Sequence, residues 1–153
     1  DQSLAAWGLA LELNLTAPFH LTQLLEGLLR KGTRPSIVNV GSIYGSIAPD
    51  WSLYEGLAIA NPAGYGASKG GLVQLTRWLA SALAPDIRVN MVSPGGIFRD
   101  QPERFVRRYA EKTLVGRMSA EGDAIGAIIF LLGEASCYVT GQNLVVDGGF
   151  TVK

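Results

Sequence analysis

The chain has 153 residues, with 13 basic and 13 acidic side chains, so its formal net charge is zero. This length suits one domain, and the absence of any block of like charge argues against nucleic-acid binding. No uninterrupted apolar run approaches the ~20 residues of a membrane-spanning helix. The single cysteine, Cys137, cannot form an intrachain disulfide, which favours a cytoplasmic location, and we interpret it as a small buried side chain.

The first predicted element is a long helix over residues 3–30, where leucines recur at helical spacing. Pro18 lies inside this helix and is expected to kink or interrupt it. A short β-branched strand over 36–41 follows and leads directly into Ser42. Residues 43–64 contain several glycines and prolines and are predicted to form a long loop. The apolar side chains of this loop indicate packing or substrate contact rather than disorder.

A second long helix is predicted over 65–84, followed by a strand over 87–92. Residues 100–112 are predicted to form a polar, mobile helix whose basic side chains we interpret as a solvated face. The next helix, over 120–133, precedes a third strand over 143–146. The residues that this helix is expected to bury are Ile125, Ile128, Ile129, Leu131 and Leu132.

This alternation of helices and short apolar strands predicts an α/β fold. We expect a three-layer αβα, doubly wound, Rossmann-like parallel sheet with helices on both faces and right-handed crossovers. Sites in such sheets lie beyond the C-terminal ends of the strands. Ser42 and the turn at 94–96 both follow predicted strands, and Tyr65 begins a helix on the same side. The topology therefore predicts that Ser42, Tyr65 and Lys69 meet at one rim.

Tyr65 and Lys69 lie four residues apart, and positions i and i+4 share one face of a helix. A free tyrosine is a poor acid or base at neutral pH, but a nearby cation favours the phenolate. Such a tyrosine can pass a proton to or from a substrate oxygen, which a serine hydroxyl such as that of Ser42 can hold. This chemistry suits oxidation of an alcohol or reduction of a carbonyl. For the pair alone, a helix-capping tyrosine and a solvated lysine would be the favoured interpretation.

The pair is accompanied by other segments in a fixed order. These segments are Asn14–Phe19 (NLTAPF), Ile37–Ser42 (IVNVGS), Tyr65–Lys69 (YGASK), Ile87–Gly95 (IRVNMVSPG) and Tyr138–Gly149 (YVTGQNLVVDGG). Together they resemble the C-terminal part of a classical short-chain dehydrogenase/reductase over nearly the whole chain. Within that family, the residues around Ser42, Tyr54 and Pro94 resemble oxidoreductases associated with flagellin modification or nonulosonic-acid sugar synthesis.

The resemblance implies a catalytic tetrad of Asn14, Ser42, Tyr65 and Lys69. Tyr65 would be the general acid/base, and Ser42 would orient the substrate oxygen. Lys69 would favour the Tyr65 phenolate and bind the nicotinamide ribose. Asn14 would hold a water molecule in a proton relay with Lys69.

The resemblance also implies NAD or NADP as the cofactor. The residues expected to bind it are Tyr65, Lys69, Pro94, Gly95 and Ile97. The family often has a threonine two positions after Ile97, where this chain has Arg99, so one nicotinamide contact is in question. The family's glycine-rich phosphate loop and ribose selector would precede Asp1. We therefore expect residues 1–153 to be the C-terminal part of a single Rossmann-fold domain in a longer protein.

The leading functional hypothesis is an NAD(P)-dependent oxidoreductase acting on a small alcohol or carbonyl, with a sugar derivative as one candidate substrate. The alternative is an inactive fragment or a non-catalytic oligomerisation module, because the phosphate loop is missing and half a doubly wound sheet leaves a strand edge unpaired. The long apolar helices favour a homodimer or homotetramer. We expect no metal site, because the only histidine, His20, has no ligands at a suitable spacing, and we expect no membrane or nucleic-acid partner.

Overall fold

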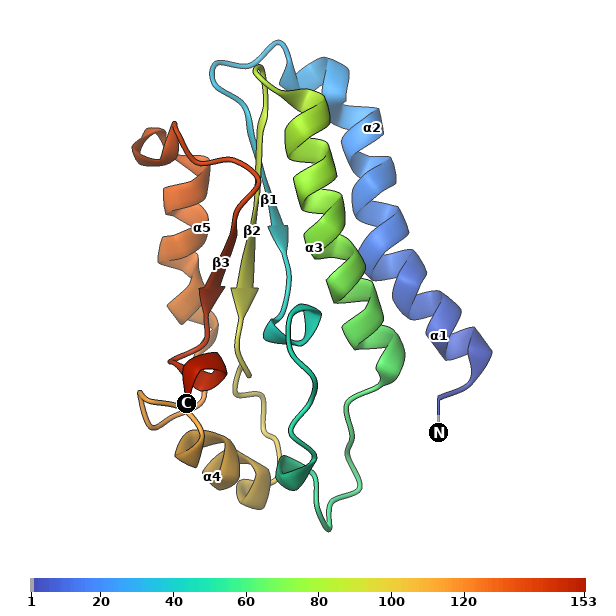
Figure 1. Ribbon diagram of the computed structural model, residues 1–153, viewed down its shortest axis with the longest axis vertical. Helices are drawn as coiled ribbons and strands as arrows, with labels where there is room; N and C mark the ends of the chain where they lie inside the picture. Colours follow the sequence, from blue (N-terminus) through green and yellow to red (C-terminus); the bar gives the residue numbers. More distant parts are fainter. Residues whose placement is uncertain (1) are drawn as a thin grey trace.

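Within residues 2–153, which the computed structural model describes, a parallel sheet has the strand order β1-β2-β3. The strands are β1 (Ser36–Val40), β2 (Arg88–Pro94) and β3 (Asn143–Val146). In the register, Ser36 lies opposite Arg88 and Met91 lies opposite Asn143. All three strands therefore end on the same side of the molecule, where the site is predicted (Figure 1).

Helices cover both faces of the sheet, which confirms the predicted three-layer α/β fold (Figure 1). On one face lie α1 (Leu4–Leu11), α2 (Ala17–Leu29) and α3 (Ala63–Leu83), and on the other lies α5 (Ile125–Leu132). None of the helices within residues 2–153 has the length and apolar character needed to cross a membrane.

The predicted long helix at the N-terminus contains a π-helical segment, Glu12–Thr16, between α1 and α2. Its wider turn is visible in the bond from the Ala17 N–H to the carbonyl of Glu12, five residues earlier. Pro18 has no N–H to donate to the carbonyl of Asn14, which an α-helix would require. The change of helix type at this point accommodates the proline, and such π segments are frequent at functional sites.

The apolar side of α3 packs against β2 and forms the core that holds this helix in place. Leu79 and Leu83 pack with Val89, while Leu72 packs with Met91, and all five are buried. Because these contacts run along most of α3, its first turn is fixed relative to the ends of the strands. That first turn carries Tyr65, and the second carries Lys69.

A second core lies between the loop after β1 and α4 (Glu103–Glu111). Its buried members are Ile43, Leu53, Phe105, Tyr109, Met118 and Phe150. Leu53 is completely buried in the loop that was predicted over residues 43–64. The loop therefore packs through its own apolar residues, one of the two roles expected for it.

The expectation about the last helix is wrong at three residues, and the one about the basic helix fails at Arg108, although Arg104 and Arg107 are exposed as expected. In α4, Arg108 donates to the carbonyls of Leu53 at 3.3 Å and Glu55 at 2.8 Å, so this charge fastens the loop instead of facing only solvent. In α5, Leu131 is buried, but three other residues expected to be buried are exposed, because an all-apolar helix can place only one face on the sheet. These exposed residues are Ile125, Ile129 and Leu132.

The cysteine prediction is also wrong. Cys137 is exposed in the connection between α5 and β3. A small thiol does not need burial, and nothing in the local pattern places it in the core.

Arg88 of β2 holds that same connection in place. Its guanidinium donates to the carbonyls of Leu131 at 3.0 Å, Gly133 at 3.2 Å and Val139 at 3.3 Å. We predict that Arg88→Met lowers the free energy of unfolding by roughly 2–3 kcal/mol, because partly buried carbonyls lose a charged donor. Thermal or urea unfolding of the protein measures this loss.

The matched control is Arg77→Met on α3, where the arginine is exposed. This change is expected to stay within about 0.5 kcal/mol of wild type. Equal stability of the two variants would contradict the anchoring role of Arg88.

Candidate active site

A cavity of about 330 Å³ opens where β1 and β2 end and α3 begins. Every residue predicted for the site except Asn14 lines it: Ser42, Tyr65, Lys69, Pro94, Gly95 and Ile97. The remaining lining residues are Val40, Gly41, Ile43, Tyr44, Asn61 and Gly96. Three larger cavities, of about 790, 480 and 450 Å³, lie elsewhere and are lined by none of the predicted residues. Size alone therefore does not identify the site, whereas the chemistry of the lining does.

Ser42 is the second residue after β1 and is held in an extended conformation with its side chain buried. Its Oγ accepts the N–H of Tyr44 at 3.2 Å. A hydroxyl that accepts one bond still has its own proton to donate. Ser42 is therefore oriented by the backbone and retains a donor for an oxygen in the cavity.

Tyr65 and Lys69 reach the cavity from the first two turns of α3. The Lys69 Nζ lies 5.8 Å from the centre of the Tyr65 ring, as expected for an i, i+4 pair. The same Nζ donates to the carbonyl of Val40 at 2.9 Å, so the lysine joins α3 to the end of β1. Burial lowers the pKa of Lys69, because removing the ammonium from water disfavours its charge.

Gly45 allows the loop after Ser42 to lie directly against the backbone of α3. A Cβ at Gly45 would lie 2.7 Å from the carbonyl oxygen of Lys69, closer than real Cβ atoms come. On the other side of this contact, a Cβ at Gly70 would lie 3.4 Å from the carbonyl oxygen of Gly45. The absence of a side chain at Gly45 is therefore what brings Ser42 and Lys69 to one cavity.

Asn14 does not line the cavity but is linked to α3 behind it. Its Nδ2 donates to the Oγ of Ser68 at 3.1 Å, and that hydroxyl donates to the carbonyl of Tyr65 at 2.8 Å. Ser68 is fully buried. Sequence reasoning missed Ser68, although its position next to Lys69, on the sheet-facing side of the helix, was a usable signal.

The turn after β2 forms the opposite wall of the cavity. The Gly95 N–H donates to the carbonyl of Val146 at 3.0 Å, and the Gly96 carbonyl accepts from the N–H of Ser119 at 2.9 Å. Among residues 2–153, the N–H of Ile97 has no protein acceptor. The turn is thus tied to its surroundings while one backbone donor beside the cavity stays unused.

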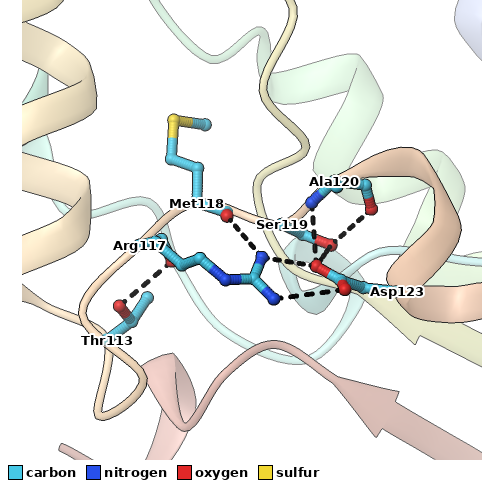
Figure 2. Close-up of polar contacts among 6 residues, drawn as sticks. All are labelled: Thr113, Arg117, Met118, Ser119, Ala120 and Asp123. Atoms are coloured by element: carbon cyan, nitrogen blue, oxygen red, sulfur yellow. Dashed lines mark hydrogen bonds and ion pairs between the residues drawn. The ribbon is translucent and has the colours of Figure 1, made fainter.

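The segment around Ser119, which pairs with this turn, is held by hydrogen bonds and an ion pair among residues 113–123 (Figure 2). Ser119 also accepts the N–H of Phe98 at 2.8 Å, and Arg117 binds the carboxylate of Asp123 at 2.6 Å. Asp123 in turn accepts the N–H of Ala120 at 2.8 Å. The bond from Arg117 is the main reason that the pKa of Asp123 falls to about 2, so the cluster stays ionised at neutral pH.

Arg99 occupies the position where the resemblance expects a threonine. Its guanidinium forms an ion pair with Glu121 at 2.8 Å, and both side chains are largely exposed. Arg99 does not line the cavity. The question over this nicotinamide contact therefore stands.

Comparison with known proteins gives consistent results. A family model described as "Enoyl-(Acyl carrier protein) reductase" matches residues 1–151. The chain is 34% identical over 142 residues to post-translational flagellin modification protein A of Campylobacter coli, covering 92% of this chain and 56% of that protein. It is 35% identical over 161 residues to cyclopentanol dehydrogenase of a Comamonas strain, covering 100% of this chain and 60% of that protein.

Solved structures agree in fold. A short-chain dehydrogenase from Leptospira borgpetersenii with bound NAD+ matches with a TM-score of 0.92 and 40% identity, over 99% of this chain and 59% of that one. A gluconate 5-dehydrogenase from Burkholderia cenocepacia in complex with NADP and tartrate matches with a TM-score of 0.87 and 26% identity, over 99% and 58%. The chain thus spans less than two thirds of the length of these relatives.

We predict that Gly45→Ala disrupts the site, because the added methyl group meets the backbone of α3. The loop or the helix must shift, and the expected loss of stability is about 1–3 kcal/mol, typical of overpacking. Unfolding measurements on the protein test this loss.

Gly27→Ala is the matched control, because a Cβ there meets nothing within 4 Å among the described residues and α2 gains a better helix former. It is expected to leave stability unchanged or raised. A Gly45→Ala variant as stable as this control would show that the close backbone contact is absent.

Proposed function

The chain belongs to the short-chain dehydrogenase/reductase family, and we propose that it carries the proton-transfer side of an NAD(P)-dependent oxidoreductase site. The observation that supports this most strongly is the convergence of Ser42, Tyr65 and Lys69 on one cavity. The substrate class is a small alcohol or the corresponding carbonyl compound. The alternative hypothesis is an inactive fragment or a non-catalytic module, which would keep the same convergence but show no cofactor-dependent turnover.

In the proposed mechanism, Tyr65 exchanges a proton with the substrate oxygen. Ser42 donates its free hydroxyl proton to the same oxygen and fixes its position. Lys69 places a cation 5.8 Å from the centre of the Tyr65 ring, where it would stabilise negative charge on the phenol oxygen during proton transfer. Because burial lowers the pKa of Lys69, its ammonium proton is also easier to release than that of a solvated lysine.

Asn14 is proposed to hold a water molecule in a relay with Lys69. The π-helical segment and Pro18 support this role, because Pro18 cannot donate to the Asn14 carbonyl. The Asn14 side chain is meanwhile held by Ser68. The residue is thus anchored by its amide group and presents a carbonyl whose usual helical donor is missing.

The cavity also fits one end of a nicotinamide cofactor, NAD or NADP. The unused N–H of Ile97 suits a carboxamide oxygen, and Gly95 lets the turn pack closely on the residue after β3, because an added Cβ would lie 2.9 Å from the Cα of Asp147. Tyr65, Lys69 and Pro94 are the other residues proposed to hold the group. When bound, nicotinamide would supply or accept the hydride that accompanies the proton carried by Tyr65.

We further propose that residues 1–153 are the C-terminal part of one Rossmann-fold domain and that the protein assembles as a homodimer or homotetramer. Exposed apolar residues on α1 to α3 give a surface that such assembly would cover. They include Leu4, Leu9, Leu13, Leu24, Leu28 and Trp78. A sugar-derived substrate and a cytoplasmic location stay predictions.

We predict that Tyr65→Phe in the whole protein lowers kcat by about 10²–10⁴-fold, because the ring keeps its shape but loses the proton. Steady-state oxidation of an alcohol substrate, followed by the absorbance of the reduced cofactor, measures the effect.

Tyr138→Phe is the control, since Tyr138 is fully exposed and lies outside the cavity. It is expected to turn over at the wild-type rate. Near-normal kcat in Tyr65→Phe would refute the acid/base role, and a wild-type protein with no cofactor-dependent turnover would favour the non-catalytic module.

A further inference from the structure

Tyr109 of α4 contacts the turn that forms one wall of the cavity. Its Oη accepts the N–H of Gly96 at 2.5 Å, although the two residues belong to different elements. Tyr109 is 1% exposed, so water does not compete for this bond. Together with the bond from Ser119 to the Gly96 carbonyl, it commits both backbone polar groups of Gly96 to the protein.

The tyrosine ring and the glycines of the turn fit one another closely. A Cβ at Gly96 would lie 2.7 Å from the Cζ of Tyr109, and a Cβ at Gly95 would lie 3.1 Å from its Oη. A side chain at Gly96 would therefore displace the ring. The turn and Tyr109 form one packed unit, and neither can move far without the other.

The ring of Tyr109 is itself held firmly. It stacks on Phe150 with 4.7 Å between ring centres and an angle of 19° between planes, and it packs against Phe105 at 5.9 Å. Burial raises the pKa of Tyr109 to about 12, so the side chain is a neutral phenol at the pH of any ordinary assay. Because the hydroxyl is neutral and its ring is packed on both sides, it can hold the Gly96 N–H in one position.

The residue after Gly96 is Ile97, which lines the cavity and whose N–H is unused among residues 2–153. The peptide plane between Gly96 and Ile97 contains the Gly96 carbonyl, which Ser119 binds, and Tyr109 fixes the preceding plane through the Gly96 N–H, so the two bonds together orient the backbone that leads into Ile97. We propose that Tyr109 is a positioning residue: by holding Gly96, it directs the N–H of Ile97 toward the carboxamide of the cofactor. This inference rests on the proposed function, because it needs a nicotinamide in the cavity.

The test is Tyr109→Phe in the whole protein, which keeps the ring and removes only the acceptor. Dissociation constants are measured for NADH, for NADPH and for ADP-ribose, which lacks the nicotinamide. We expect the variant to bind the reduced dinucleotide about 5–10-fold more weakly, the equivalent of one hydrogen bond. ADP-ribose lacks the nicotinamide that would meet this turn, so its affinity is expected to be unchanged.

Leu83→Ala serves as the control for a purely structural effect. It removes a buried side chain at the C-terminal end of α3, which packs in the cluster of Val89 and not in that of Tyr109. It is expected to lower Tm at least as much as Tyr109→Phe while leaving the ratio of NADH to ADP-ribose affinity at the wild-type value.

The outcomes separate the two proposals. If wild-type protein binds the reduced dinucleotide and Tyr109→Phe binds it equally well, the positioning role is overturned and the proposed function stands. If the variant weakens NADH and ADP-ribose to the same extent, the role is structural and the positioning proposal is again overturned. If wild-type protein binds neither NADH nor NADPH, the proposed function fails and the positioning role fails with it.

Discussion

The site depends on one close approach of two backbones, between the loop after β1 at Gly45 and the second turn of α3 at Lys69. Packing of the apolar face of α3 against β2 fixes the position of the helix relative to the sheet. Gly45 allows the loop that follows β1 to lie directly against the helix backbone. Ser42 and Tyr65 then reach the same cavity from elements that are distant in sequence. The bond from Lys69 to the Val40 carbonyl crosses the same junction and places a cation beside the phenol.

The opposite wall is the turn at 94–97, which hydrogen bonds with neighbouring elements hold in place. The turn donates to Val146 of β3 and to the Tyr109 hydroxyl, and it accepts from Ser119. Tyr109 also belongs to the aromatic core that joins α4 to the loop after β1. Contacts through Tyr109 therefore join the loop, α4 and the turn to one another. A substrate that contacts the loop and a cofactor that contacts the turn would both bind to this one packed unit.

Local pattern was sufficient for the elements and for the Tyr65–Lys69 pair, because helical spacing and strand ends are set by short stretches of chain. It failed where the outcome depends on tertiary partners. The exposed side of α5 is as apolar as its buried side, so Ile129 could not be told from Leu131 by periodicity. The role of Tyr109 could not be predicted from the sequence, because its bond to Gly96 joins α4 to a separate turn. No regular residue spacing indicates such a contact.

The central claim is that Ser42 and Tyr65 share one substrate oxygen, with the Lys69 ammonium 5.8 Å from the centre of the Tyr65 ring. The most direct measurement is a crystal structure of the whole protein with reduced cofactor and a carbonyl ligand bound. The account predicts that the Ser42 Oγ and the Tyr65 Oη both lie within about 2.6–3.2 Å of the carbonyl oxygen. A ligand oxygen bound away from both hydroxyls, or a Tyr65 hydroxyl turned out of the cavity, would contradict it.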